Sequence, residues 1–204
     1  MRYKHVFAIC AYKDSPYLER CIRSLKAQTV PSHIIICTST PSSYIDRLAW
    51  KYGLQVYVRQ GESNIKDDWN FAYSMAEGGL VTIAHQDDMY HRDYSAGLLA
   101  AHKRYPDMTV FTTDYVIVKQ GKLITGDAML WIKRILRMPL RFPQMNDRAW
   151  LKKLAFVLGN PICCPATTYH KAALGEPLVR SEYSFALDWD NLVRLAEEPG
   201  RFIC

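Results

Sequence analysis

The stretch LVTIAHQDDMYHRDY (residues 80–94) decides the fold, because an apolar run leads directly into two adjacent carboxylates. Residues 80–84 are apolar or small, as in a buried strand. Asp87 and Asp88 follow just beyond that run, and two adjacent carboxylates are costly to hold together unless a cation neutralises them. The stretch therefore predicts a buried strand that ends in a cation-binding turn. The alternative is a turn whose aspartates cap the helix that follows.

The residues before this stretch alternate between strand patterns and helix patterns. Apolar and β-branched runs predict strands, and apolar spacings of three and four predict helices. In chain order we predict strand 4–10, helix 15–29, strand 33–37, helix 42–53, strand 54–60 and helix 65–79. This alternation predicts an α/β fold with a parallel, doubly wound sheet, in which ligands bind beyond the carboxyl ends of the strands. The loops after Cys10 and Cys37 should open at the same edge as Asp87 and Asp88.

Particular residues predict where three of these helices begin or end. Ser15 can cap the first helix, with Pro16 in its first position. Gly53 should end the second helix, and the Gly78-Gly79 pair should end the third.

The second half of the chain does not continue the regular alternation of strands and helices. We predict a helix over residues 94–106 and a hairpin over 108–124 that turns at 119–122. Residues 127–159 combine helical spacing with two prolines, Pro139 and Pro143, and predict two helical pieces with a break. A final helix is expected over 186–200, stopped by Pro199-Gly200.

Composition sets further bounds. The chain has 204 residues, of which 49% are hydrophobic and 23% are charged, which is ordinary for one large domain or one domain with an appendage. No apolar run approaches the roughly 18 residues of a membrane-spanning helix. None of the six cysteines lies in a CxxC pair. A reduced, cytoplasmic protein is therefore the simplest interpretation.

Four segments, taken in order, resemble family-2 glycosyltransferases of the GT-A fold. No single segment is specific, and the order and spacing carry the resemblance. The segments are FAICAYKDSPYLERCIRSLKAQT (7–29), IIICTSTPSS (34–43), NFAYSMAEGGLVTIAHQDD (70–88) and FALDWDNLVRLAEEPGRFIC (185–204). The resemblance implies a Rossmann-like, mostly parallel central sheet flanked by helices, with a smaller mixed sheet and helical part on the acceptor side. It implies one domain over 1–204, with a nucleotide-sugar-binding half at 1–94 and an acceptor-binding half at 95–204.

The resemblance also implies an activity. The family transfers a sugar from a nucleotide-diphosphate sugar, with a UDP-sugar favoured here, to the hydroxyl of a saccharide or lipid-linked acceptor. Such a reaction would be metal-dependent and inverting, and would serve polysaccharide or glycolipid synthesis. Asp88 would ligate a divalent cation, Mn²⁺ or Mg²⁺, that bridges the diphosphate. Asp87 would contact the ribose or assist the metal. Hard cations of this kind prefer oxygen ligands and often share them with substrate phosphates.

Carried over in the same way, Tyr12 and the backbone of Cys10 and Ala11 would hold the nucleotide base. Thr38 or Ser39 stands where the family usually has a base-binding Asp, so the identity of the nucleotide stays open.

Two further positions concern the nucleotide-sugar site that the resemblance implies. His85 occupies a position that is often acidic in the family. Lys66 lies with Asn64 and Asn70 in a segment that runs beside the nucleotide in the family, and a solvated helix face explains these three residues about as well.

Asp188, in Leu187-Asp188-Trp189-Asp190, resembles the acceptor-side acid of the family and would deprotonate the acceptor hydroxyl. An inverting transfer needs one such base opposite the leaving diphosphate. The alternative for Asp188 is an acid favoured by the dipole at a helix N-terminus, a role that Asp190 could also serve. Asp114, at a predicted strand end, either touches acceptor or sugar or belongs to an ordinary turn.

The last residues, GRFIC (200–204), predict the beginning of a strand. The family usually continues into a segment with a further metal-binding His. We therefore expect that the C-terminal part of the domain is incomplete here.

The net charge of +6 is concentrated in residues 129–153, which carry seven Lys and Arg against one acid, Asp147. Trp131, Ile132 and Ile135 interleave with these charges. An interfacial amphipathic helix that contacts the cytoplasmic face of a membrane is one interpretation. A helix that packs over the acceptor side with its charges solvated is the other. No nucleic-acid recognition motif is present, so we expect no nucleic-acid partner.

Two other functions remain as alternatives. AHQDDM (84–89) resembles the AHPDDE of zinc-dependent de-N-acetylases, although Gln86 and Met89 replace the Pro and Glu of that motif. A non-catalytic nucleotide-sugar-binding module is the second alternative.

Overall fold

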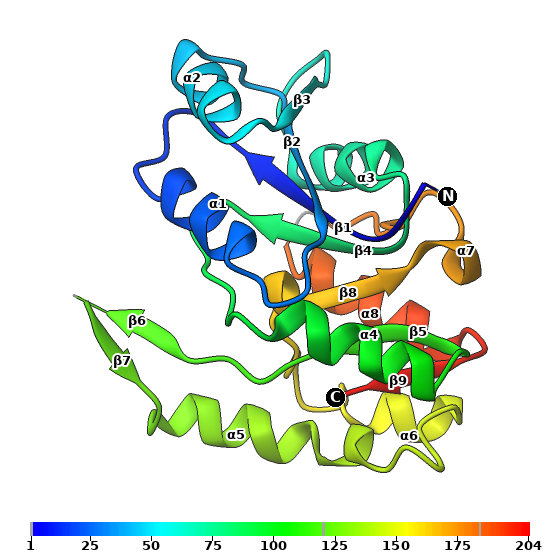
Figure 1. Ribbon diagram of the computed structural model, residues 1–204. Coiled ribbons are helices and arrows are strands. Elements are labelled where there is room, and N and C mark those ends of the chain that lie inside the picture. The colour runs from blue at the N-terminus through cyan, green and yellow to red at the C-terminus, as the bar shows by residue number, and fades with distance from the viewer. Residues whose placement is uncertain (1, 120, 184) are drawn as a thin grey trace.

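A single seven-stranded sheet forms the centre of the molecule (Figure 1), in a computed structural model that describes residues 2–119, 121–183 and 185–204. Its strands in spatial order are β3 (Gln55–Val58), β2 (His33–Thr38), β1 (Tyr3–Ala11), β4 (Gly78–His85), β8 (Thr167–His170), β5 (Met108–Thr112) and β9 (Arg201–Ile203). Among these described strands only β8 runs opposite to the others. The predicted mostly parallel α/β sheet is therefore confirmed.

Helices cover both faces of the sheet. Successive residues of a strand point to opposite faces, so each central strand contributes side chains to two cores. On one face, Phe7 and Ile9 of β1 pack in a core with α1 (Leu18–Lys26), α2 (Ser43–Tyr52) and α4 (Tyr94–Arg104). On the other face, Val6 and Ala8 pack in a core with α3 (Ile65–Met75) and α8 (Leu187–Glu197). The remaining described elements are the hairpin of β6 (Ile117–Lys119) and β7 (Lys122–Ile124), α5 (Ala128–Leu136), α6 (Ala149–Leu154), α7 (Lys171–Leu174), and two 3₁₀ turns, η1 (Met138–Arg141) and η2 (Cys164–Ala166).

The predicted start of the first helix at Ser15 is wrong. The backbone N–H of Leu18 donates to the Ser15 carbonyl (3.3 Å), and the N–H of Tyr17 donates to the Ser15 hydroxyl (3.3 Å). Ser15 therefore organises a separate turn, and α1 begins after it at Leu18. The predicted end of the second helix is confirmed, because Gly53 follows α2 with a φ of 61°, a left-handed conformation that favours glycine.

The predicted role of Gly78-Gly79 is also wrong. Helix α3 ends at Met75, and both glycines lie at the start of β4. A Cβ on Gly78 would lie 2.7 Å from Cγ2 of Val6. Gly78 therefore permits the close approach of β4 to β1 rather than ending a helix.

The second half mostly follows its predicted pattern. The predicted helix 94–106 corresponds to α4, and the proline-containing stretch forms α5, η1 and α6 with a break between them. The predicted hairpin is shorter than expected, because β5 joins the main sheet and only β6 and β7 pair as a hairpin. Residue 120, in the predicted turn, lies outside the described residues. Helix α8 precedes Pro199-Gly200 as predicted, and the last residues form β9.

Two of the seven cations in residues 129–153 are buried, so these two are not solvated as the packed-helix interpretation expected. Arg137 is 1% exposed and Lys152 is fully buried. The Lys152 ammonium donates to the carbonyls of Glu198 (2.6 Å) and Gly200 (2.9 Å), which fixes α6 beneath the end of α8. No helix in the described part of the chain combines the length and the apolar character needed to cross a bilayer.

Candidate active site

A cavity of about 470 Å³ opens where the carboxyl ends of β1, β2 and β4 meet, which is the edge predicted for ligand binding. Its walls come from the loop after β1, the end of β2, the start of α3 and the turn after β4. The residues that line it are Cys10, Ala11, Tyr12, Cys37, Thr38, Ser63, Asn64, Ile65, Asp68, Trp69, Phe71, His85, Gln86 and Asp87.

Gln86 ties the turn after β4 to the loop after β1. The Tyr12 backbone N–H donates to Oε1 of Gln86 (3.0 Å), and Nε2 of Gln86 donates to the Tyr12 carbonyl (2.9 Å). The Tyr12 ring stays 47% exposed, and the Lys13 ammonium lies 4.9 Å from its centroid. The backbone of Tyr12 is thus fixed while its ring remains available to stack on a planar ligand.

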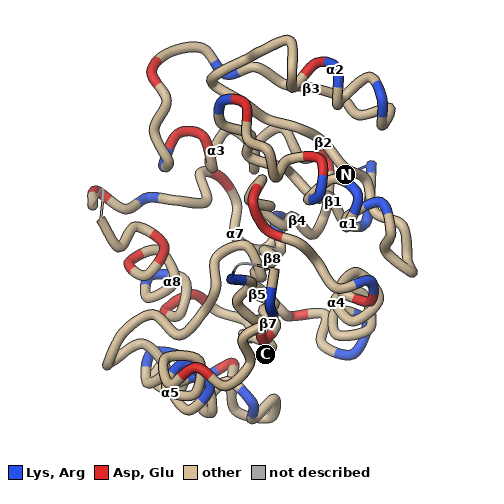
Figure 2. Tube along the Cα trace, turned by 90° about the vertical axis from the view of Figure 1, so that its left-hand side faces the viewer, with Lys and Arg blue, Asp and Glu red and all other residues tan. Residues whose placement is uncertain are grey.

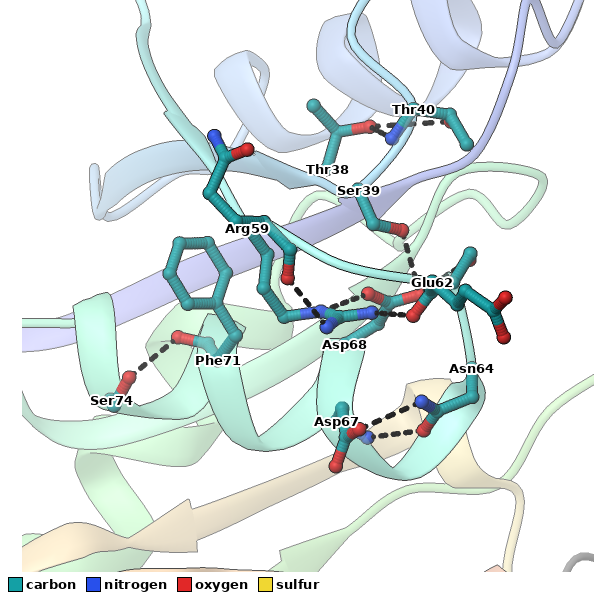
Figure 3. A network of polar contacts seen from close by, with 12 residues as sticks. Thr38, Ser39, Thr40, Arg59, Glu62, Asn64, Asp67, Asp68, Phe71 and Ser74 are labelled. Carbon is teal, nitrogen blue, oxygen red and sulfur yellow. Dashed lines mark hydrogen bonds and ion pairs between the residues drawn. The ribbon is translucent and has the colours of Figure 1, made fainter.

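Asp68, which the sequence did not single out, places a carboxylate in this cavity (Figure 3). Its Oδ2 accepts hydrogen bonds from the hydroxyls of Ser39 (3.0 Å) and Ser63 (2.8 Å), and its Oδ1 accepts one from Nε of Arg59 (2.7 Å). The Asp68 side chain is 21% exposed. Asp67 and Asp68 both lie in the first turn of α3, where acids are generally favoured by the helix dipole, so their positions in the sequence do not mark Asp68 as a site residue.

The remaining predicted nucleotide residues lie in different environments. Thr38 lines the cavity, and its hydroxyl accepts from the backbone N–H of Thr40 (3.0 Å). Ser39 reaches the cavity through Asp68. The Lys66 ammonium lies 3.3 Å from Glu182, and Lys66 is not among the residues that line the cavity. Asn70 pairs with both the N–H and the carbonyl of Val179, which is a structural role.

The turn after β4 gathers three groups that could hold a metal ion. The ligand atoms of His85, Asp87 and Asp88 all lie within 4.8 Å of one another. Asp87 is exposed and Asp88 is half-buried. Burial and the charge of Asp87 raise the pKa of Asp88 to about 6. The two carboxylates therefore repel each other as the sequence implied, and a bound cation would relieve that repulsion.

His85 strengthens this fit. Its Nε2 is buried and has no hydrogen-bond partner among the described residues. Burial lowers its pKa, against the opposing charges of Asp87 and Asp188, so the ring favours the neutral form that binds metals. Two carboxylates and one imidazole are a donor set that suits Mn²⁺, and Mg²⁺ would rely on the carboxylates. The sequence marked His85 as a departure from the transferase family pattern and as the histidine of the motif that resembles the de-N-acetylases.

Asp188 lies in the first turn of α8 and is held from two sides. Its Oδ2 accepts from Nδ2 of Asn160 (2.8 Å), and its Oδ1 accepts from the backbone N–H of Trp189 (2.9 Å). Ala186, which precedes the helix, has a φ of 58°, a conformation that costs a non-glycine residue roughly 1 kcal/mol. The strained start of α8 and the contact with Asn160 thus orient one carboxylate whose charge is felt at His85.

A second cavity, of about 490 Å³, lies on the other side of the acidic turn. Its walls come from the turn after β4, the segment after β5 and the 3₁₀ turn η2. The residues that line it are Asp88, Met89, Tyr90, His91, Asp93, Tyr94, Thr113, Asp114, Tyr115, Val116, Cys163, Pro165 and Ala166. Since Asp87 lines the first cavity and Asp88 lines the second, the acidic pair lies between them.

Asp114 is an anchor for two cations. Arg134 donates to it from Nε (2.8 Å), and Arg137 pairs with its other oxygen. Burial opposes ionisation, but these hydrogen bonds hold the pKa of Asp114 below its usual range. Asp114 therefore joins α5 to the segment after β5.

The sequence matches the model of glycosyl transferase family 2 over residues 6–161. The chain belongs to this family. The match covers most of β1, the strands from β2 to β7, the first cavity and the acidic turn, and it ends before β8 and β9. No curated protein sequence matches the chain.

Solved structures of glycosyltransferases share the fold of this family-2 chain. Residues 1–349 of TarS from S. aureus match with a TM-score of 0.69 and 16% identity, over 98% of this chain and 57% of that one. The mannosyltransferase PcManGT from Pyrobaculum calidifontis, in complex with GDP-Man and Mn²⁺, matches with a TM-score of 0.66 and 13% identity, over 100% and 55%. Glucosyl-3-phosphoglycerate synthase from Mycobacterium tuberculosis, with Mg²⁺ and UDP, matches with a TM-score of 0.64 and 13% identity, over 99% and 69%. The chain thus spans little more than half the length of the first two structures.

Membership of family 2 also bears on the alternatives. The acidic pair follows β4, the fourth strand of the chain, and lies within the residues that match the family model. Family and position together therefore favour a transferase site over a zinc hydrolase site.

Proposed function

We propose that this chain carries the donor site and the base of a metal-dependent, inverting glycosyltransferase. The single observation that supports this most is the position of the acidic pair between two cavities. A donor in the first cavity and an acceptor in the second would meet at Asp87 and Asp88. A divalent cation held by Asp88, Asp87 and His85 would take up the charge of the leaving diphosphate.

The first cavity suits a nucleoside. The open ring of Tyr12 offers a stacking surface, and the Asp68 carboxylate offers an acceptor for an imino N–H of the base. Uracil and guanine carry such an N–H, and cytosine does not. UDP is favoured because TarS and glucosyl-3-phosphoglycerate synthase both have structures with UDP.

Asp188 would act as the base on the acceptor side. The donors from Asn160 and Trp189 hold the orientation of its carboxylate, while each oxygen keeps a lone pair for the acceptor hydroxyl. Its carboxylate would accept the hydroxyl proton as the acceptor oxygen attacks the anomeric carbon opposite the diphosphate. A saccharide or lipid-linked acceptor in polysaccharide or glycolipid synthesis fits such a site. The free cysteines agree with work on the cytoplasmic side.

The test separates donor binding from transfer. We expect Asp88→Ala to abolish Mn²⁺-dependent binding of UDP in calorimetry. Asp188→Asn should bind UDP like the wild type but release UDP from a UDP-sugar about a hundredfold more slowly, the usual scale of a lost general base. Asp46→Asn, which removes an exposed acid on α2, should change neither measurement.

Three results would contradict the proposal. Normal turnover by Asp188→Asn would refute the assignment of the base. Stoichiometric bound zinc, with no effect of Mn²⁺ on nucleotide binding, would favour the hydrolase instead. Binding of UDP without turnover of any UDP-sugar would support a non-catalytic module.

A further inference from the structure

Large apolar side chains are exposed on the β6–β7 hairpin, on α5 and on the residue after η1, which are neighbouring parts of the chain. The fully exposed faces of globular helices are normally polar, but α5 has only Leu130 buried among its residues. Six of these large apolar side chains are 44–70% exposed. We call the following six residues the docking face: Val118, Leu123, Trp131, Ile132, Ile135 and Phe142.

The docking face has a firm attachment to the rest of the molecule. Arg134 on α5 donates to the Thr125 carbonyl (3.2 Å) and to Asp114, and Arg137 donates to the Thr113 carbonyl (3.0 Å). These contacts join α5 to the base of the hairpin. The exposed apolar side chains therefore belong to an ordered surface.

Exposed cations surround the docking face. They comprise two lysines of the hairpin, Lys119 and Lys122, and two arginines beyond α5, Arg141 and Arg148. Figure 2 shows Lys and Arg along α5, at the end of the molecule opposite α2.

Besides Asp114, this region contains two acids, Asp127 and Asp147, and each has a partner of its own. Asp127 caps α5 by accepting from the Met129 N–H (2.8 Å), and Asp147 lies 3.8 Å from Arg201. The potential around the apolar side chains is therefore positive.

We propose that this face docks the protein on a membrane surface that contains anionic phospholipids. Trp131 and Phe142 are side chains of the kind that settle at the level of the headgroups, and the neighbouring Lys and Arg match anionic headgroups. An apolar stripe with basic residues beside it is the pattern of an interfacial helix that lies on a bilayer without crossing it.

Other occupants fit the charges less well. In a symmetric dimer formed through this face, two surfaces of the same positive charge would face each other. An uncharged apolar partner would leave the ring of cations without a role. An anionic lipid surface accounts for the apolar and the basic residues together.

The position of the docking face gives it a role in catalysis, and this role rests on the proposed function. Tyr115 and Val116, at the base of the hairpin, line the same cavity as Asp88. Docking through the hairpin and α5 would hold the mouth of this second cavity near the lipid headgroups. A lipid-linked acceptor would then reach the acidic turn without leaving the membrane.

Vesicle flotation tests the docking face directly. We expect the wild-type chain to float with vesicles of phosphatidylcholine and phosphatidylglycerol in equal parts, and to be released as salt is raised. Trp131→Glu and Ile135→Glu should each weaken this binding about tenfold, since each moves a charge into the interface. Trp50→Glu removes an 88% exposed tryptophan from α2, at the opposite end of the molecule, and should float like the wild type.

Each contrary outcome is specific. Equal flotation with pure phosphatidylcholine, or none with either vesicle, would overturn the proposal. A dimer in light scattering that Trp131→Glu converts to a monomer would show that a second copy occupies the face. Asp88→Ala should float like the wild type, so loss of the donor site and loss of docking are distinguishable. Unchanged melting temperatures of the variants would show that the changes in flotation do not come from unfolding.

Discussion

Asp68 places a carboxylate where the loop after β2 has only hydroxyls. The sequence showed that Thr38 and Ser39 depart from the acid of the family at this point. It did not show that the carboxylate of Asp68, 29 positions later, accepts a hydrogen bond from the hydroxyl of Ser39. Pairings of this length depend on how α3 packs against the sheet, which local patterns do not contain. The positions of Tyr12, Asp87 and Asp88 at the sheet edge were predictable, because each lies within three residues of the end of β1 or β4, both of which were predicted.

Replacing Asp68 tests whether this carboxylate binds the nucleotide base. We expect Asp68→Asn to weaken UDP binding about tenfold or more, because a hydrogen bond to a charged group contributes roughly 1.5–3 kcal/mol. Binding of CDP should weaken less, because cytosine has no imino N–H that could donate to Asp68. Calorimetric titration of both nucleotides in the presence of Mn²⁺ measures the difference.

Asp67→Asn is the matched control, because Asp67 pairs with Asn64 and is not among the residues that line the cavity. Equal losses for UDP and CDP in Asp68→Asn would show that Asp68 only supports Arg59 and the loop. An unchanged UDP titration would remove Asp68 from the site altogether.

At the scale of elements, apolar periodicity predicted the strands and helices that pack on a core. It failed at β8 (Thr167–His170), which is a short strand of mostly polar residues without an apolar run. This strand is recognisable only by its neighbours, because it pairs with β4 and β5 in the middle of the sheet. The prediction for Gly78-Gly79 failed for a related reason. The sequence does not distinguish a glycine that close packing requires from a glycine that ends a helix.

The packing role of Gly78 predicts the effect of adding one methyl group. Gly78→Ala would bring its Cβ within 2.7 Å of Val6 and 3.0 Å of the Leu80 carbonyl. We expect a loss of roughly 1–3 kcal/mol in the free energy of unfolding, the usual cost of overpacking. Urea unfolding followed by circular dichroism measures this loss.

Gly97→Ala provides a control of opposite sign. Gly97 lies inside α4, and a Cβ there would meet nothing within 4 Å. This substitution should stabilise the protein by up to about 1 kcal/mol, the difference in helix propensity. If both substitutions shift stability equally, the contact with Val6 does not constrain the sheet.

At the scale of the whole molecule, one sheet carries the predicted nucleotide half and acceptor half. Strands β1 to β4 come from the first part of the chain, and β8, β5 and β9 extend the same sheet. The assignment of each half to one substrate stays a prediction. Asp188 is a hundred residues beyond Asp88 in the sequence, so only the family resemblance, and no local pattern, associated the two.

A buried chain of polar groups crosses the junction between these halves. His5 on β1 contacts the hydroxyls of Ser32 and Thr82 (2.8 Å each), and Thr82 contacts Thr168 on β8. The hydroxyl of Tyr94 completes the chain at Thr168 (2.9 Å). The His5 ring is 3% exposed, and its hydrogen-bond partners are uncharged. Burial lowers the pKa of His5 from 6.5 to about 3.

This buried histidine makes the stability of the whole fold depend on pH. Below pH 6.5 the unfolded chain binds a proton at His5 while the folded chain does not, so stability is present above that pH and falls as the pH falls. Between pH 7 and pH 5 we expect His5 to account for about 2 kcal/mol of lost unfolding free energy. His5→Gln should be less stable at pH 7 but should lose about 2 kcal/mol less over this interval. Contributions of other titrating groups are common to both proteins and cancel in the comparison, which urea unfolding at the two pH values provides. Parallel losses in the two proteins would mean that His5 is protonated in the folded state or reaches solvent.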